Sequence, residues 1–176
     1  MHPLLSVWDR VELSARTDDV LEVYAAAMEV HPAAARTRKG ILLSHLDRRG
    51  LKAVAALEGD ELVGIAYGYV GEPGQWWRDH VAAAMTSEQA RAWLSSAFEV
   101  CEFHVRPELQ GRGLGRDLLT TLLSGIGTTT AVLTTPDHET RARRFYRADG
   151  WQDVVIGLRF PGDPRSFAVL GKPLEP

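Results

Sequence analysis

The chain has 176 residues, of which 45% are apolar and 24% are charged, and its formal net charge is −3. These values are typical of one globular domain, and without a basic excess they argue against a general nucleic-acid binder. One cysteine, Cys101, excludes an internal disulfide and fits a reducing compartment, so we expect a cytoplasmic protein. No stretch approaches the roughly 20 apolar residues that span a bilayer, and the first residues do not have the pattern of a signal peptide.

The N-terminal part predicts one strand and two helices. Residues 7–14 alternate loosely between apolar and polar side chains, which favours a strand. Thr17 is then the expected N-cap of a helix, because two aspartates follow it in the first turn and apolar residues recur at helical spacing. Pro32 should end that helix, and a shorter one is predicted over residues 41–49, ended by Gly50.

The middle of the chain predicts a hairpin and then a loop. Residues 53–57 and 62–70 are apolar runs joined by Glu-Gly-Asp-Glu, a sequence suited to a tight turn between antiparallel strands. Residues 71–77 contain two glycines, a proline and two tryptophans and are expected to form a loop. The sequence Thr-Ser-Glu-Gln at 86–89 has the capping-box pattern, so a helix should begin there.

The C-terminal part alternates strands and helices. The expected elements are a strand over 98–105, a leucine-faced helix from residue 114 to about 125, a strand over 131–134, a helix capped by Asp137 that ends at Gly150, and a strand pair over 154–160 and 167–171. A hairpin followed by alternating strands and helices predicts a mixed sheet covered by helices on both faces, an α/β fold.

A glycine-rich turn lies between the strand over 98–105 and the following helix. Glycines at 111, 113 and 115 allow the backbone to approach a ligand, because no Cβ intervenes. The first amides of the helix then form a phosphate-binding end, to which Arg112 and Arg116 can add charge. The segment lacks the Lys-Ser/Thr of a Walker loop and the third glycine of a dinucleotide loop. From the glycines alone, an ordinary strand-to-helix turn stays a second interpretation.

Two motifs about 30 residues apart resemble the signatures of the GNAT N-acetyltransferase superfamily. Gln-Gly-Arg-Gly-Leu-Gly at 110–115 matches Gln/Arg-x-x-Gly-x-Gly/Ala, and Ala-x-x-Phe-Tyr-x-x-x-Gly-Trp at 142–151 is similar to the second signature. The resemblance extends over roughly residues 10–172 and implies one domain over 1–176. It also implies the GNAT acyl-CoA N-acyltransferase fold, a mixed, mainly antiparallel sheet that splays between strands 4 and 5, with helices on both faces.

The resemblance also implies acetyl-CoA as the cofactor and assigns roles to residues of this chain. Pantetheine would pair with the strand end, the amides of the glycine turn would hold the pyrophosphate, and Tyr146 would protonate the departing thiolate. The residues implied to hold the cofactor are Phe103, His104, Val105, Gln110, Gly111, Arg112, Gly113, Leu114, Gly115 and Arg116. No metal ion is implied.

The chain departs from the family pattern at positions that bear on catalysis. Glu139 stands where many members have an asparagine that contacts the cofactor, and Thr134 stands where some carry a glutamate base on the fifth strand. Other members have that base on the fourth strand, where this chain offers Glu99 and Glu102. Their odd spacing places them on opposite faces of a regular strand, and Glu102 is nearer the cofactor-binding end.

Each of these residues also has a structural interpretation. Tyr146 and Cys101 could be core residues, Glu99 and Glu102 surface groups of an edge strand, and His104 a satisfied structural histidine. The arginines in the sequence over 141–147 could form a solvated helix face or contact the cofactor's 3′-phosphate. Trp76 and Trp77 could pack the loop or form a wall of the substrate site.

The function predicted from these observations is transfer of an acetyl group from acetyl-CoA to a primary amine of a small molecule or peptide. The amine would attack directly, with no covalent enzyme intermediate. The alternatives are a non-catalytic acyl-CoA-binding module and a transferase for a longer acyl group. We expect neither nucleic acid nor membrane as a partner, and a homodimer is common among similar proteins.

Overall fold

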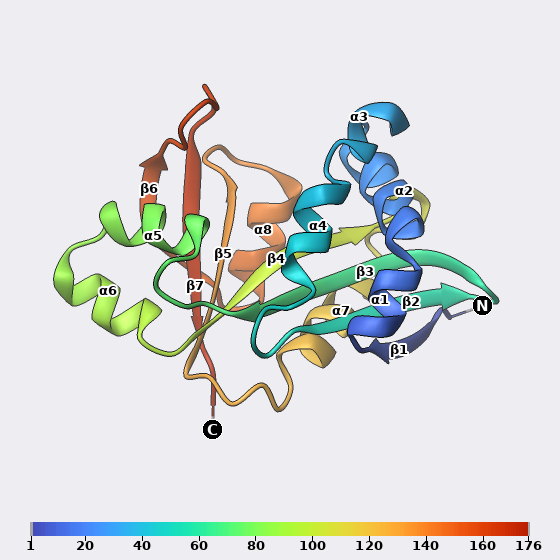
Figure 1. The fold of residues 1–176 in the computed structure, drawn as a ribbon, viewed down its shortest axis with the longest axis horizontal. Coiled ribbons are helices and arrows are strands. Elements are labelled where there is room, and N and C mark those ends of the chain that lie inside the picture. The colour runs from blue at the N-terminus through green and yellow to red at the C-terminus, as the bar shows by residue number, and fades with distance from the viewer. Residues whose placement is uncertain (1, 176) are drawn as a thin grey trace. The chain divides into compact units, whose positions relative to one another are not determined.

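The computed structural model describes residues 2–175, which form two compact units (Figure 1). Unit 1 comprises the chain up to Tyr69 together with Val100–Ile126, and unit 2 comprises Val70–Glu99 together with the chain from Gly127 onward. The hydrogen-bonded strand order is β1-β2-β3-β4-β5-β7-β6. The prediction of a mixed α/β fold with a mainly antiparallel sheet is confirmed.

Unit 1 is built on an antiparallel meander. Its strands are β1 (Leu4–Trp8), β2 (Lys52–Glu58), β3 (Glu61–Val70) and the second half of β4 (Ala97–Val105). β1 pairs with β2, and β2 pairs with β3 through a turn in which Gly59 has a φ of 61°. This left-handed conformation favours glycine, so the sequence allows the tight turn that the hairpin requires.

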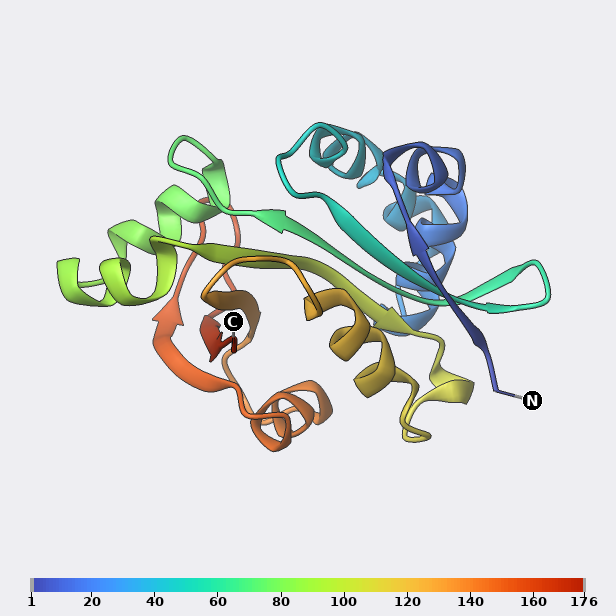
Figure 2. The same ribbon diagram turned by 90° about the horizontal axis from the view of Figure 1, so that it is seen from below.

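The helices of unit 1 lie on both faces of this meander. They are α1 (Arg10–Ala15), α2 (Thr17–Met28), α3 (Pro32–Arg36), α4 (Lys39–His45), the 3₁₀ turn η1 (Pro107–Leu109) and α7 (Leu114–Leu123). Figure 2 shows α1–α4 on one face of β1–β3 and α7 on the other. Lys52 of β2 caps the C-terminal end of α7, because its Nζ donates to the carbonyl oxygens of Thr121 and Ser124, each at 2.7 Å.

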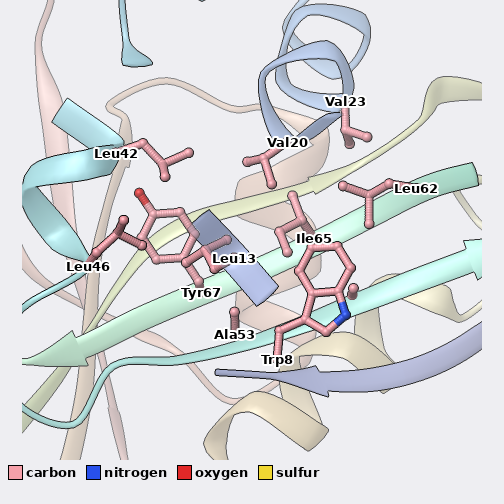
Figure 3. Packing of buried hydrophobic residues seen from close by; sticks show 11 residues of the cluster. Trp8, Leu13, Val20, Val23, Leu42, Leu46, Ala53, Leu62, Ile65 and Tyr67 are labelled. Carbon is pink, nitrogen blue, oxygen red and sulfur yellow. The ribbon is translucent and has the colours of Figure 1, made fainter. Parts of the chain in front are cut away.

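The main core of unit 1 lies between the meander and helices α1, α2 and α4. Figure 3 shows side chains from these helices directed at side chains of the strands. The buried members of this cluster are Trp8, Leu13, Val20, Val23, Leu42, Leu46, Ala53, Ala55, Leu62, Ile65 and Tyr67. Cys101 packs against this cluster and is half-buried, in agreement with its structural interpretation.

Two predictions for the N-terminal part of unit 1 were wrong. The strand expected over residues 7–14 ends at Trp8, because Asp9 caps α1 and forms a capping box with Glu12. Thr17 is the first residue of α2, whose N-cap is Arg16. The Thr17 hydroxyl donates instead to the carbonyl oxygen of Ser14 at 2.7 Å.

Unit 2 joins the first half of β4 to three further strands. Its elements are α5 (Trp76–Ala83), α6 (Ser87–Leu94), β5 (Thr130–Pro136), α8 (Arg141–Ala148), β6 (Gln152–Leu158) and β7 (Phe167–Pro173). β7 is antiparallel to both β5 and β6. β4 and β5 are parallel, and their pairing joins Ala97, Phe98 and Glu99 to residues 130–132. Such a short pairing is expected where the fourth and fifth strands of this fold separate.

Unit 2 confirms one helix start and corrects two others. The capping box of Thr86 and Gln89 begins α6 as predicted. Trp76 and Trp77 belong to α5 rather than to the predicted loop, which ends at Gln75. The N-cap of α8 is Thr140 and not Asp137. Asp137 instead accepts hydrogen bonds from the Gly157 amide and from Arg143.

Within residues 2–175, no helix is long and apolar enough to cross a membrane.

Candidate functional site

The glycine turn of unit 1 leaves the start of α7 open to a ligand. Gly111 and Gly113 have φ values of 77° and 90°, and Gly113 is the N-cap of α7 with no side-chain cap. A Cβ added at Gly113 would meet no atom within 4 Å, so the space beside the turn is open. The first amides of a helix need acceptors, and the helix dipole favours an anion. These observations fit a phosphate group at this end of α7.

Hydrogen bonds fix the turn to the end of β4. The Gln110 side-chain amide donates to the carbonyl oxygen of Val105 at 2.9 Å. The Arg106 main-chain amide donates to Val63 O at 3.0 Å, and its guanidinium Nε donates to Leu62 O at 3.2 Å. The strand end and the glycine turn therefore have a defined relative position within unit 1.

A surface hollow of about 340 Å³ adjoins the same turn. Its lining consists of His2, Pro3, Leu109, Arg112 and Leu114. The hollow therefore combines apolar side chains with the His2 imidazole and the Arg112 guanidinium, next to the start of α7.

Glu102 lies at the centre of a polar cluster that joins β4 to α2 and to the residue before α4. One carboxylate oxygen, Oε1, accepts from Arg38 at 2.5 Å, and the other, Oε2, lies 2.5 Å from Nε2 of His104. The Glu102 and His104 side chains are each only 12% exposed. Burial raises the pKa of Glu102, but the hydrogen bonds and charges of His104 and Arg38 outweigh burial and lower it. Glu102 is therefore held as an anion.

A tyrosine from α2 completes this group. The Tyr24 ring meets the His104 ring edge-on, with 5.2 Å between centroids, and the Arg38 guanidinium lies over the Tyr24 ring at 4.6 Å. Tyr24, Arg38, Glu102 and His104 are called the Glu102 cluster below. It combines a buried anion, an imidazole and an aromatic face, which are the groups that bind and deprotonate a cationic amine.

A second polar pair lies deeper in unit 1. His45 Nδ1 is 2.9 Å from the Tyr67 hydroxyl. Burial lowers the pKa of His45 and raises the pKa of Tyr67, so both groups are neutral at pH 7. The charge of Glu102 acts on both, which links this pair electrostatically to the Glu102 cluster.

The interpretation of Glu99 and Glu102 as surface groups was wrong. Glu99 is buried and pairs in register with Val132 of β5, and the Glu102 side chain is only 12% exposed. The roles of both glutamates in catalysis stay predictions.

Tyr146 is a buried residue of α8 in unit 2. It is 8% exposed, and its ring makes edge contacts with Phe145 at 5.5 Å and Trp151 at 5.7 Å between centroids. Burial raises the pKa of its phenol, which therefore keeps its proton at neutral pH. A protonated phenol is the state that a general acid requires.

The two tryptophans of α5 have different surroundings. Trp77 donates from Nε1 to the Thr134 hydroxyl at 3.3 Å, so this threonine orients an indole. Trp76 is 57% exposed and stacks on Phe160 with 5.4 Å between centroids. Trp76 therefore presents an aromatic surface to solvent, whereas Trp77 packs against the core of unit 2.

The arginines of α8 do not form a uniformly solvated face. Arg143 is buried and pairs with Asp137 at 3.0 Å and Asp153 at 2.6 Å, which corrects its interpretation as a surface residue. Glu139 lies 3.4 Å from Arg147 and 3.8 Å from Arg144. Its charge is thus accompanied by two exposed cations.

Sequence reasoning found Glu102 and His104 but missed their partners. Arg38 precedes α4 and Tyr24 lies in α2, far from β4 in the sequence. These helices carry no family motif, and an arginine or tyrosine on an amphipathic helix has many ordinary roles. Only the folded chain brings them to Glu102.

Comparisons with known proteins agree with this description. A family profile described as Acetyltransferase (GNAT) family matches residues 17–151. The GCN5-like protein acetyltransferase Rv2170 of Mycobacterium tuberculosis is 35% identical, covering 93% of this chain and 94% of that protein.

Solved structures share the fold. An aminoglycoside 6′-acetyltransferase type Ii has a TM-score of 0.69 at 17% identity, over 98% of each chain. The yncA protein of Salmonella typhimurium, solved with its cofactor acetyl-CoA, has a TM-score of 0.66 at 15% identity, over 100% of this chain and 96% of that one. PaiA N-acetyltransferase of Thermoplasma acidophilum, solved with coenzyme A, has a TM-score of 0.61 at 13% identity, over 97% and 99%. By its profile and its mycobacterial relative, this chain belongs to the acetyltransferase (GNAT) family.

Proposed function

We propose that the protein transfers an acetyl group from acetyl-CoA to a primary amine. The observation that carries this proposal is the glycine turn before α7, with its uncapped helix start, positive φ angles and open space at Gly113. The cofactors named for the yncA and PaiA structures support acetyl-CoA as the donor. When bound, acetyl-CoA supplies an acetyl thioester.

The donor-binding residues are proposed to be those of the strand end and the turn. The amides at the start of α7 and the guanidinium groups of Arg112 and Arg116 suit the negative charge of a pyrophosphate. The main chain of residues 103–105 is proposed to pair with the pantetheine arm as an added strand would. The side chain of Gln110 supports this arrangement, since it holds the turn to Val105.

The acceptor is proposed to be an alkyl amine. Such an amine is mostly protonated at pH 7 and has no lone pair for attack until a base removes a proton. Glu102 and Glu99 are the carboxylates proposed to take part in this step, either directly or through a neighbouring group, and the buried anion of the Glu102 cluster favours Glu102. Tyr146 is proposed to return a proton to the leaving thiolate, because burial keeps its phenol protonated at neutral pH.

Of the two acceptor classes, an amine of a protein or peptide is proposed in preference to a free small molecule. The support is the name of the 35% identical relative, a protein acetyltransferase. Trp76 and Trp77 are proposed to contribute to acceptor binding, because Trp76 exposes a stacked aromatic surface. A cytoplasmic location, a homodimer and a single domain over residues 1–176 stay predictions.

Two measurements test the proposal. Isothermal titration should detect binding of acetyl-CoA, and a thiol-release assay should detect turnover with lysine-containing peptides. Absence of binding at high micromolar acetyl-CoA would refute the donor assignment. Binding without thiol release against a broad panel of peptide and small amines would instead support the non-catalytic acyl-CoA-binding module.

A further inference from the structure

The surroundings of Glu102 are unfavourable for a carboxylate that must itself accept a proton. Each of its two oxygens already has a partner at 2.5 Å, Arg38 on Oε1 and His104 on Oε2. Its lowered pKa also makes it a weak base at neutral pH. These contacts instead suit a fixed anion that orients and stabilises a neighbouring group.

That neighbouring group is the imidazole of His104. Because an ionised carboxylate only accepts hydrogen bonds, the short contact to Oε2 assigns the proton of the neutral imidazole to Nε2. Nδ1 then carries the lone pair. Among residues 2–175, no hydrogen bond to Nδ1 is present, and the His104 side chain is 12% exposed. The edge contact with Tyr24 restricts rotation of the ring.

We propose that Nδ1 of His104 is the general base for the acceptor amine, and that Glu102 is the positioning residue that holds its imidazole. This inference rests on the proposed acetyl transfer and identifies which group prepares the amine. An N–H bond of the acceptor's ammonium group breaks and an Nδ1–H bond forms. The positive charge passes from the amine to the imidazolium, the neutral amine keeps its lone pair for attack, and the imidazolium later releases the proton to solvent.

The position of His104 in β4 suits this role. It lies within residues 103–105, whose main chain is the proposed partner of the donor's pantetheine arm. A base on this segment would therefore lie beside the proposed position of the donor.

The charged and titratable groups around the imidazole belong to β4, α2 and β3, and to α4 with the residue before it. Glu102 of β4 stabilises the imidazolium directly, whereas Arg38 before α4 offsets part of this effect from the far oxygen of Glu102. The Tyr24 ring of α2 is in T-shaped contact with the imidazole, and the charge of Glu102 also acts on the pair of His45 and Tyr67. The anion in direct contact is the strongest of these influences, because the interaction falls with distance.

The test compares two acceptors that differ in their need for a base. A lysine-like alkyl amine is protonated at pH 7, whereas aniline is mostly neutral and can attack without losing a proton first. His104→Gln should lower kcat/KM for the alkyl amine about 10²- to 10⁴-fold, the usual contribution of a general base, and for aniline less than about 10-fold. His45→Gln removes another histidine of unit 1 and should leave the ratio of the two activities unchanged.

Each outcome of this comparison decides the matter. Equal losses on both amines, or no loss on either, would overturn His104 as the base while leaving acetyl transfer intact. Wild-type protein that binds acetyl-CoA but releases no thiol with any amine would refute the proposed function, and the base assignment with it. Isothermal titration with acetyl-CoA should give the same affinity for wild type and His104→Gln.

A second readout needs neither turnover nor a folded variant of His104. In ¹⁵N-labelled wild type above pH 8, the ring nitrogens of His104 should show the Nε2–H tautomer, and Glu102→Ala should reduce this preference. The His45→Gln spectrum helps to assign the ring signals. An Nδ1–H tautomer in wild type would overturn the proposal, because the lone pair would then face Glu102.

Discussion

Gly113 and Gly125 allow a controlled test of the glycine turn, because they flank opposite ends of α7 in similar conformations. Their φ values are 90° and 68°, and a Cβ added at either residue would meet no atom within 4 Å. Valine at either position should therefore cost a similar amount of folding stability, about 1–3 kcal/mol for a strained backbone residue. Only Gly113 precedes the amides proposed to hold the pyrophosphate.

Gly113→Val should weaken acetyl-CoA binding far more than Gly125→Val. A hydrogen bond to a charged group contributes about 1.5–3 kcal/mol, so displacing one amide from the phosphate should raise Kd about 10- to 150-fold. Isothermal titration with acetyl-CoA gives Kd for both variants, and thermal unfolding verifies that their stabilities match. Equal affinities in the two variants would refute the turn as the phosphate site.

Three further predictions concern individual side chains. Tyr146→Phe should lower kcat about 10²-fold with little change in the Kd of acetyl-CoA, and unchanged turnover would remove Tyr146 from the mechanism. Arg143→Ala should lower the free energy of unfolding, measured by urea denaturation, by about 3 kcal/mol, because it leaves Asp137 without its buried partner. The control Arg144→Ala, at an exposed arginine, should change it by less than about 0.5 kcal/mol. Because the folded pKa of Glu102 lies below its unfolded value, its contribution to stability is present above about pH 4.3 and is lost as the pH falls through the folded pKa. Wild type should therefore lose more thermal stability than Glu102→Gln between pH 5 and pH 3, and parallel losses would contradict this.

The elements that could be predicted from the sequence have local causes. The β2–β3 hairpin follows from a four-residue turn with glycine, and the start of α6 follows from a capping box. The glycine turn before α7 and the helix with Tyr146 are short motifs with fixed spacing, so their positions needed no knowledge of distant contacts.

The elements that were mispredicted contain competing local signals. In residues 7–14 the loose alternation of side chains favours a strand, but the Asp9 and Glu12 capping box begins a helix after only five strand residues. Before α5, the glycines and the proline favour a loop, yet the helix begins directly after them. At both places, one local sequence pattern favours a different structure from the one that forms. At α1, the capping box outweighs the alternation of side chains.

The arrangement of the Glu102 cluster could not be predicted, because it depends on contacts between distant segments. Glu102 and His104 are two residues apart in β4, so their proximity follows from strand geometry alone. The position of Arg38 depends on how α3 and α4 pack on the sheet. The ionisation of Glu102 depends on that packing in turn.

The contact between Lys52 and the last carbonyls of α7 has a consequence for ligand capture. A cation at the C-terminal end compensates the negative pole of the helix and ties that end to β2. At the other end, Asp117 lies in the first turn of α7 but no side chain caps the first amides, so these amides would be available to a diphosphate. The proposed phosphate site would therefore lie at the start of a helix whose other end is held to β2 by Lys52.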